Sequence, residues 1–271
     1  MQLKFSKYQG LGNDFIIIQE FHCPPDINFQ KLAKNLCDRH WSIGADGLII
    51  LKQESKTADF TWEYINSDGS YAEMCGNGMR CFAKYIYDNN FINKQEFKVQ
   101  TKLRIVDCTV IDKNHIKVDM GQPLVDFLNK EIQVLDKRFK INAISMGNPH
   151  AVIFLEGIVY SQFQDFDVQK YGSALENNTE LFPNKTNVEF IYIEDKQIHL
   201  RVWERGCGET LACGTGACAS VVATILNKKA SKNKDISVLL KGGELKILWG
   251  DNNYIYMTGE TKKVFQGIIE I

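Results

Sequence analysis

Two cysteines, Cys75 and Cys213, stand in nearly the same setting in the two halves of the chain. Each begins a Cys-Gly-x-Gly sequence that leads into an apolar, alanine-containing segment, and they lie 138 residues apart in a chain of 271. A polar residue precedes each of them by nine positions, Asn66 in one case and Glu204 in the other. Another pair of landmarks repeats at an offset of 135 residues, Gly12-Asn13 and Gly147-Asn148. This order indicates an internal duplication in which each half presents one thiol to a shared cleft.

A cysteine at the start of a helix lies beside unpaired backbone N–H groups and a partial positive charge. We expect that setting to stabilise the thiolate and lower the thiol pKa, so that the cysteine becomes a usable base. The same helix starts offer free N–H groups that could hold a carboxylate, at Gly76, Asn77, Gly214 and Thr215. One thiolate and one thiol on opposite faces of an α-carbon could invert it by proton transfer. That chemistry needs no cofactor.

The composition is that of an ordinary folded protein, with 44% hydrophobic and 24% charged residues. A net charge of −1 and the lack of a basic block argue against a nucleic-acid or anionic-membrane partner. The first residues have no apolar core of signal-peptide length, and no apolar run approaches a membrane span. We therefore expect a cytoplasmic protein whose eight cysteines are thiols. None of them forms Cys-x-x-Cys, so no metal site is expected.

Each cysteine segment needs a strand before it and a helix after it. Phe60–Ile65 alternates like a half-buried strand that delivers Asn66, and a helix is predicted from Gly78 to Asn89. In the second half, Ile198–Trp203 delivers Glu204 and a helix is predicted from Thr215 to Leu226. Two further helices are expected at Ile27–His40 and Asp167–Leu175. Strands are expected at Leu3–Tyr8, Phe15–Gln19, Gly47–Leu51, Phe97–Thr101, Arg104–Ile111, Ile116–Met120, Phe139–Met146, Ala151–Leu155, Asn187–Ile193, Ile236–Leu240, Glu244–Trp249, Tyr254–Thr258 and Val264–Ile271.

Gly121-Gln122-Pro123 interrupts this pattern and marks a domain boundary. The prediction is an N-terminal domain of residues 1–120 with Cys75 and a C-terminal domain of residues 121–261 with Cys213. The strand-like tail, residues 262–271, is expected to return to the first domain.

Six ordered segments resemble the diaminopimelate epimerase family across nearly the whole chain: G-L-G-N-D-F, D-R-H-W-S-I-G-A-D-G-L, N-S-D-G-S-Y-A-E-M-C-G-N-G-M-R-C, M-G-N-P-H-A-V, N-V-E-F and E-R-G-C-G-E-T-L-A-C-G-T-G-A-C-A. The resemblance implies a cytoplasmic, pyridoxal-phosphate-independent isomerase that interconverts LL- and meso-diaminopimelate in lysine and peptidoglycan-precursor synthesis. It also implies an α/β fold of two pseudo-symmetric domains, each a mixed, mostly antiparallel sheet wrapped around a central helix.

Position by position, the resemblance assigns the acid/base role to Cys75 and Cys213, and a role in tuning the thiols to His150 and Glu204. The implied substrate contacts are Asn13, Asn66, Gly76, Asn77, Asn148, Asn187, Glu204, Arg205, Gly214 and Thr215. Family members are typically homodimers through their edge strands, and Phe265 aligns near an aromatic position of that interface. The chain departs from the family pattern at three positions, with Gly47 where some relatives have glutamine, Trp203 for the commoner tyrosine and Cys207 where small residues are usual.

Three other functions fit part of the pattern. A proline or hydroxyproline racemase of the same fold resembles Met-Cys-Gly-His-Gly at the first thiol, but Asn77 stands in the place of that histidine. A phenazine-biosynthesis-like isomerase would not need both thiols. A thiol protein that binds metal or acts in redox chemistry belongs to a different class, and zinc bound stoichiometrically by Cys75 and Cys213 would identify it.

Overall fold

The computed structural model describes residues 2–52, 57–72 and 74–271. The chain divides into two units, one formed by Met1–Asp119 with Thr258–Ile271 and the other by Met120–Met257. It passes from the first unit to the second within strand β8 (His115–Gly121) and returns within β17 (Ile255–Glu260). No helix in the described part of the chain is both long enough and apolar enough to cross a membrane.

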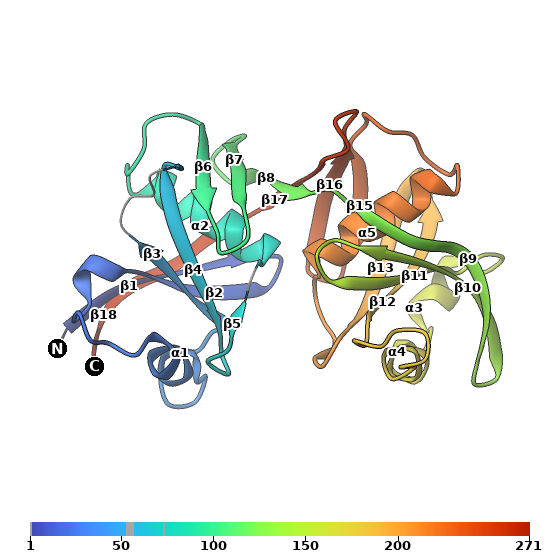
Figure 1. Ribbon diagram of the computed structural model, residues 1–271, viewed down its shortest axis with the longest axis horizontal. Helices are drawn as coiled ribbons and strands as arrows, with labels where there is room; N and C mark the ends of the chain where they lie inside the picture. The colour runs from blue at the N-terminus through green and yellow to red at the C-terminus, as the bar shows by residue number, and fades with distance from the viewer. Residues whose placement is uncertain (1, 53–56, 73) are drawn as a thin grey trace. The chain divides into compact units, whose positions relative to one another are not determined.

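The first unit is a mixed sheet around helix α2 (Gly76–Asp88) (Figure 1). The tail strand β18 pairs antiparallel with β1, and β1 pairs antiparallel with β2. The pairs β2/β3 and β4/β6 are parallel, and the pairs β3/β4, β4/β5, β6/β7 and β7/β8 are antiparallel. The other elements are β1 (Gln2–Gly10), β2 (Asn13–Gln19), the 3-10 turn η1 (Glu20–His22), α1 (Phe29–Cys37), β3 (Gly47–Lys52), β4 (Phe60–Asn66), β5 (Tyr71–Ala72), β6 (Glu96–Gln100), β7 (Ile105–Val110) and β18 (Lys262–Glu270).

The second unit follows the same scheme around helix α5 (Gly214–Leu226) (Figure 1). β9, β10 and β11 pair antiparallel, β11/β12 and β13/β15 are parallel, and β12/β13, β13/β14 and β15/β16 are antiparallel. The elements are β9 (Leu124–Val134), β10 (Lys137–Ser145), β11 (Pro149–Phe154), α3 (Tyr160–Gln164), α4 (Val168–Glu176), β12 (Asn187–Glu194), β13 (Gln197–Glu204), β14 (Gly208–Glu209), β15 (Ile236–Leu240) and β16 (Gly243–Trp249).

Both central helices are buried along most of their length, for different sequence reasons. α5 is apolar on every side, and its alanine and valine side chains are buried from Ala217 to Ala223. α2 carries Lys84 among its buried residues, and the ammonium group bonds Asp88 at 2.9 Å and the carbonyl oxygen of Lys113 at 2.6 Å. A buried charge requires such partners. The expected fold class, two similar sheets each wrapped around a helix, is confirmed.

Several predicted boundaries were wrong. α1 was expected over Ile27–His40, but the Asn28 side chain accepts a hydrogen bond from the Lys31 N–H at 2.9 Å and caps the helix there. α2 begins two residues before the predicted Gly78, directly after its cysteine. The strand β9 was not predicted at all, because its side chains are mostly exposed and give no clear alternation. The short elements η1, β5, α3 and β14 were also missed.

Candidate active site

The first thiol site lies at the start of α2. Cys75 is the N-cap residue of the helix, with an extended backbone, and its sulfur accepts the N–H of Gly78 at 3.4 Å. The first helical backbone bond runs from the Met79 N–H to the Cys75 carbonyl oxygen. The N–H groups of Gly76 and Asn77 precede that bond, so neither has an acceptor within the helix. The expected combination of a half-buried thiol and helix-start donors is therefore present within this unit.

Of the three asparagines expected at this site, Asn13 contacts the thiol and Asn77 contacts Asn13. The side-chain oxygen of Asn13 lies 3.8 Å from the Cys75 sulfur and accepts the Asn77 amide at 3.3 Å. The Asn77 side-chain oxygen is buried and has no hydrogen-bond partner within the described ranges. Asn66 ends β4 and donates to the Ser70 hydroxyl at 2.9 Å. The unit thus brings the turn before β2 to the start of α2.

A charged network that the motif analysis did not single out holds Asn13 in place. The Asn13 amide donates to Asp46 at 2.6 Å. Arg39 contacts both Asp46, at 2.8 Å, and Asp14, at 2.6 Å. Lys7, which is almost fully buried, pairs with Asp14 at 2.8 Å and also donates to the Gly44 carbonyl oxygen. Residues from β1, β2 and the loop before β3 are joined here by charge.

This network makes the stability of the first unit depend on acid pH. Burial alone would raise the pKa of Asp14, but hydrogen bonds from Arg39 and Lys7 outweigh it and lower the pKa from 3.8 to about 2. A carboxyl with a depressed pKa in the folded state stabilises the fold above its unfolded-state pKa, and this contribution is lost as pH falls. We expect Asp14 to contribute about 2 kcal/mol that disappears between about pH 4 and pH 2.

The measurement is the free energy of unfolding against pH for the parent chain and for Asp14→Asn. The variant should lose the part of the acid dependence that Asp14 causes. Asp107→Asn, at an exposed carboxylate 3.9 Å from Lys98, is the control and should retain the full slope. Equal slopes in the parent and Asp14→Asn would refute the assignment.

The second thiol site lies at the start of α5 and repeats the geometry of the first. Cys213 is the N-cap residue, and its sulfur accepts the N–H of Gly216 at 3.4 Å. The first backbone bond of the helix joins the Ala217 N–H to the Cys213 carbonyl oxygen, so the N–H groups of Gly214 and Thr215 have no acceptor within the helix. The Thr215 hydroxyl lies 3.5 Å from the sulfur. Cys213 is 5% exposed.

A line of polar side chains leads from this thiol into the interior of the unit. The Asn148 amide donates to the Thr215 hydroxyl at 3.3 Å, and its side-chain oxygen contacts His150 Nε2 at 3.0 Å. His150 Nδ1 lies 2.7 Å from Glu189 Oε1, and both of these side chains are fully buried. The turn before β11, which corresponds to the Asn13 turn, therefore reaches the start of α5.

Asn187, Glu204 and Arg205 lie at neighbouring ends of β12 and β13. The Asn187 amide donates to the Pro149 carbonyl oxygen at 2.9 Å and accepts the Arg205 N–H at 3.0 Å. The Arg205 guanidinium is exposed and donates to the Asn184 carbonyl oxygen at 2.9 Å. Glu204 accepts the Thr210 hydroxyl at 2.5 Å. Burial raises the pKa of Glu204, although its contacts with Thr210 and Cys213 act in the other direction.

The expectation of a lowered thiol pKa is wrong for Cys213 in this structure. Burial, followed by the nearby carboxylates of Glu204 and Glu189, raises the pKa of Cys213 well above its usual value. The contacts with Thr215 and the Gly216 N–H favour the thiolate but do not outweigh these causes. Of the two roles that an acid/base pair of thiols requires, these surroundings favour that of the acid for Cys213.

Comparisons with known proteins fit this pair of thiol sites. The family model for diaminopimelate epimerase matches residues 5–125 and 142–264. The diaminopimelate epimerase of Halothermothrix orenii is 45% identical over 100% of this chain and 99% of its own length. That of Desulfitobacterium hafniense is 40% identical over 98% of both chains. The chain belongs to the diaminopimelate epimerase family. It is therefore an isomerase.

Solved structures of lower identity share the fold of this diaminopimelate epimerase family member. A hydroxyproline epimerase from Agrobacterium vitis superposes with a TM-score of 0.76 at 11% identity, over 99% of this chain and 92% of its own. A phenazine biosynthesis protein of Bacillus anthracis superposes with a TM-score of 0.73 at 15% identity, over 100% of both chains. At these identities the likeness concerns the fold alone.

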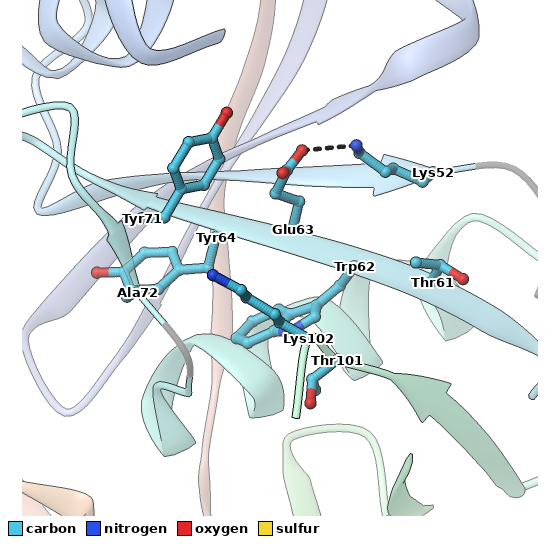
Figure 2. A pocket seen from close by; sticks show the side chains of 9 residues that line it. All are labelled: Lys52, Thr61, Trp62, Glu63, Tyr64, Tyr71, Ala72, Thr101 and Lys102. Carbon is cyan, nitrogen blue, oxygen red and sulfur yellow. Dashed lines mark ion pairs between the residues drawn. The ribbon is translucent and has the colours of Figure 1, made fainter. Parts of the chain in front are cut away.

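Gly47, which begins β3, is one of the positions where we expected this chain to depart from the family pattern. A Cβ atom there would lie 2.4 Å from the ring of Tyr64 and 2.9 Å from the Ile65 carbonyl oxygen. Tyr64 stacks on Trp62 with ring centres 5.8 Å apart, and both line a hollow of about 180 Å³ beside Lys102 (Figure 2). The ring of Tyr64 thus fills the space that a side chain at position 47 would need.

The motifs identified the residues at the helix starts of this diaminopimelate epimerase family member but missed those behind them. Glu189 lies in the N-V-E-F segment that contributed to the resemblance, yet nothing marked it for a role. The signal that could have found it is an acid inside a strand whose neighbours Val188 and Phe190 are apolar. The motif analysis also missed three residues in the first two resembling segments. Asp14 lies in G-L-G-N-D-F, and Arg39 and Asp46 lie in D-R-H-W-S-I-G-A-D-G-L. In the described part of the chain, no group of His, Cys, Asp and Glu side chains could hold a metal ion.

Proposed function

We propose that this chain interconverts LL-2,6-diaminopimelate and meso-diaminopimelate without a cofactor, using Cys75 and Cys213 as the acid/base pair. The observation that carries the proposal is that equivalent cysteines cap equivalent helices, each beside two N–H groups without an acceptor in the helix. A single helix-capping cysteine would be unremarkable. Two helix-capping cysteines in a duplicated chain are what a reaction needs when one cysteine acts as base and another as acid.

The reaction moves one proton off an α-carbon and another onto it. A thiolate removes the α-proton from one face, and the bond's electrons pass into the substrate carboxylate as negative charge. The N–H groups of Gly76, Asn77, Gly214 and Thr215 hold that charge, which is larger in the transition state than in the ground state. The other thiol then delivers its proton to the opposite face. Cys75 and Cys213 exchange roles when the substrate has the other handedness.

The remaining site residues are proposed to recognise a substrate with an amino and a carboxylate group at each end. Asn13, Asn66, Asn148, Asn187 and Glu204 supply amide and carboxylate contacts, and the exposed guanidinium of Arg205 binds the distal carboxylate. A substrate that lacks the distal groups would leave these side chains unpaired and would bind poorly. His150 and Glu204 tune the thiols.

We place the enzyme in the cytoplasm, in lysine and peptidoglycan-precursor synthesis, as a homodimer. Support for the dimer comes from β18, on which Val264, Phe265 and Ile268 are 54%, 46% and 58% exposed. Phe265 also contacts Phe5 edge to face, with ring centres 5.8 Å apart. Apolar side chains exposed on one strand favour a protein partner.

Incubation of LL-diaminopimelate with the enzyme in heavy water tests the proposed function. The expected product is meso-diaminopimelate with one deuterium at the inverted α-carbon, detected by mass spectrometry and proton NMR. L-Proline and trans-4-hydroxy-L-proline serve as controls and should remain unlabelled. Labelling of proline but not of diaminopimelate would overturn the proposal in favour of a racemase of cyclic amino acids.

A further inference from the structure

Equivalent positions beneath the two thiols are occupied by different kinds of side chain in the two units. In the parallel pair β11/β12, His150 is opposite Asn187, and in β2/β3 Phe15 is opposite Gly47. His150 thus corresponds to Phe15. Glu189, two residues after Asn187, corresponds to Ile49, two residues after Gly47. An acid and an imidazole in the second unit take the place of an aliphatic and an aromatic side chain in the first.

The helix starts give the same correspondence independently. A Cβ atom built on Gly216 would lie 2.6 Å from Glu189 Oε1 and 3.3 Å from the Cys213 sulfur. A Cβ atom built on Gly78, its counterpart, would lie 3.4 Å from both Ile49 Cδ1 and Phe15 Cε1. The carboxylate of Glu189 therefore packs directly under the first turn of α5.

The fold itself does not require this buried pair. Glu189 is 0% exposed, and its second oxygen, Oε2, has no hydrogen-bond partner within the described ranges. Burying a carboxylate with half of its acceptors unused is unfavourable. The first unit fills the corresponding place with apolar side chains and builds the same sheet and helix. Only the second unit bears the unfavourable free energy of this buried carboxylate. An unfavourable feature that the fold does not need indicates a functional role for it.

The contacts between Glu189 and the thiol can form one directed chain of hydrogen bonds. A carboxylate accepts at His150 Nδ1 and the Asn148 oxygen lies 3.0 Å from Nε2, so both contacts are hydrogen bonds when His150 carries a proton on each nitrogen. With its oxygen engaged, Asn148 turns its NH₂ group to the Thr215 hydroxyl. That hydroxyl accepts from Asn148, and its own hydrogen can be donated to the Cys213 sulfur, 3.5 Å away, when this sulfur is a thiolate; with a protonated thiol either group could be the donor.

We infer that Glu189 is a positioning residue for Cys213: through His150 and Asn148 it fixes the direction of the hydrogen-bond chain, so that Thr215 donates to the thiolate when Cys213 acts as base. In many enzymes a nucleophile is activated by a neighbouring base, and a third residue orients that base. Glu189 has a comparable orienting role here. The polar contacts of Cys75 follow a different route, through Asn13 to Asp46, while Phe15 and Ile49 occupy the places that correspond to His150 and Glu189. This inference rests on the proposed function for its catalytic meaning.

Glu189→Gln is the test, since it keeps the shape and removes the charge that orients the chain. We expect kcat for LL-diaminopimelate to fall about 10- to 100-fold while KM changes little, as for groups that support the residues in contact with substrate. The rate of Cys213 alkylation by iodoacetamide, followed by peptide mass spectrometry, should fall at least about threefold, because the lost hydrogen bond from Thr215 outweighs the removal of a carboxylate that by itself raises the pKa of Cys213. The rate at Cys75 should not change.

Ile49→Val, at the corresponding place under Cys75, is the matched control and should leave both alkylation rates and kcat within about twofold. If Glu189→Gln fails to fold, the double variant Glu189→Ile with His150→Phe installs the apolar pair of the first unit. It should fold, and its Cys213 should be alkylated slowly.

Faster alkylation of Cys213 in Glu189→Gln would mean that the carboxylate acts only by its own field, and an equal change at both thiols would mean a general structural effect. Either result overturns the inference. The alkylation readout needs no substrate, so it remains decisive even if diaminopimelate proves not to be turned over.

Discussion

Neither Cys75→Ala nor Cys213→Ala should epimerise diaminopimelate, with kcat reduced at least about 1000-fold, near the upper part of the range for loss of a general acid or base. Each variant retains one thiol, but a single thiol serves only one face of the α-carbon. The loss should therefore be nearly complete in both variants and in both directions of the reaction.

The fold should survive either change. Each sulfur is the helix cap, but it accepts only a 3.4 Å bond from a backbone N–H. Loss of a much stronger oxygen cap typically costs about 1 kcal/mol. Thermal unfolding and circular dichroism should thus remain close to those of the parent, and steady-state rates give the activity.

Cys81→Ala and Cys218→Ala are the matched controls, since both cysteines are fully buried within the same helices. They should lower stability by about 1 kcal/mol, as expected for a small buried group, and keep kcat. Near-normal turnover in Cys75→Ala or Cys213→Ala would end the two-thiol assignment.

Gly216→Ala should impair the enzyme far more than Gly78→Ala, although the two glycines occupy equivalent helix positions. The new methyl group at position 216 would lie 2.6 Å from Glu189 Oε1 and 3.3 Å from the Cys213 sulfur. Glu189 is fully buried and has no room to withdraw. We expect a loss of about 1–3 kcal/mol, typical of overpacking, together with at least about a tenfold fall in kcat because the thiol is displaced.

At Gly78 the nearest atoms are 3.4 Å away, which is ordinary contact. Alanine there should change stability by less than about 1 kcal/mol, because the helix gains from alanine what the packing loses. Urea unfolding and steady-state rates of the two variants provide the comparison. Equal losses at both positions would show that the glycines serve backbone geometry and that the Glu189 carboxylate is irrelevant.

Much of the site was predictable because it depends on short stretches of chain. Cys-Gly-x-Gly before an apolar segment predicted that Cys75 and Cys213 begin helices, and the structure makes both of them caps. A strand before each motif, ending at Asn66 or Glu204, followed from alternation over a few residues. The repeated spacing of these motifs predicted two similar halves, and the resemblance to the diaminopimelate epimerase family implied that each is a sheet wrapped around a helix.

Three features needed the tertiary structure. The side chains of strand β9 are mostly exposed, so its sequence lacks the alternation of buried and exposed residues by which a strand is predicted. The raised pKa of Cys213 comes from burial and from carboxylates on β12 and β13, neither of which the helix-start argument contains. The ring of Tyr64 fills the space beside Gly47 because β3 and β4 pair in one particular register.

From its sequence alone, this protein can be read as a duplicated chain with two helix-capping thiols, because capping and alternation are set by neighbours within a turn or a strand. Only the tertiary structure decided which side chains pack beneath each of the two thiols. His150 contacts Glu189 across 39 positions of sequence, while in the other unit Phe15 and Ile49 both lie beside Gly78. Strand register and burial decide which distant residues come into contact, and neither can be predicted from a short stretch of sequence.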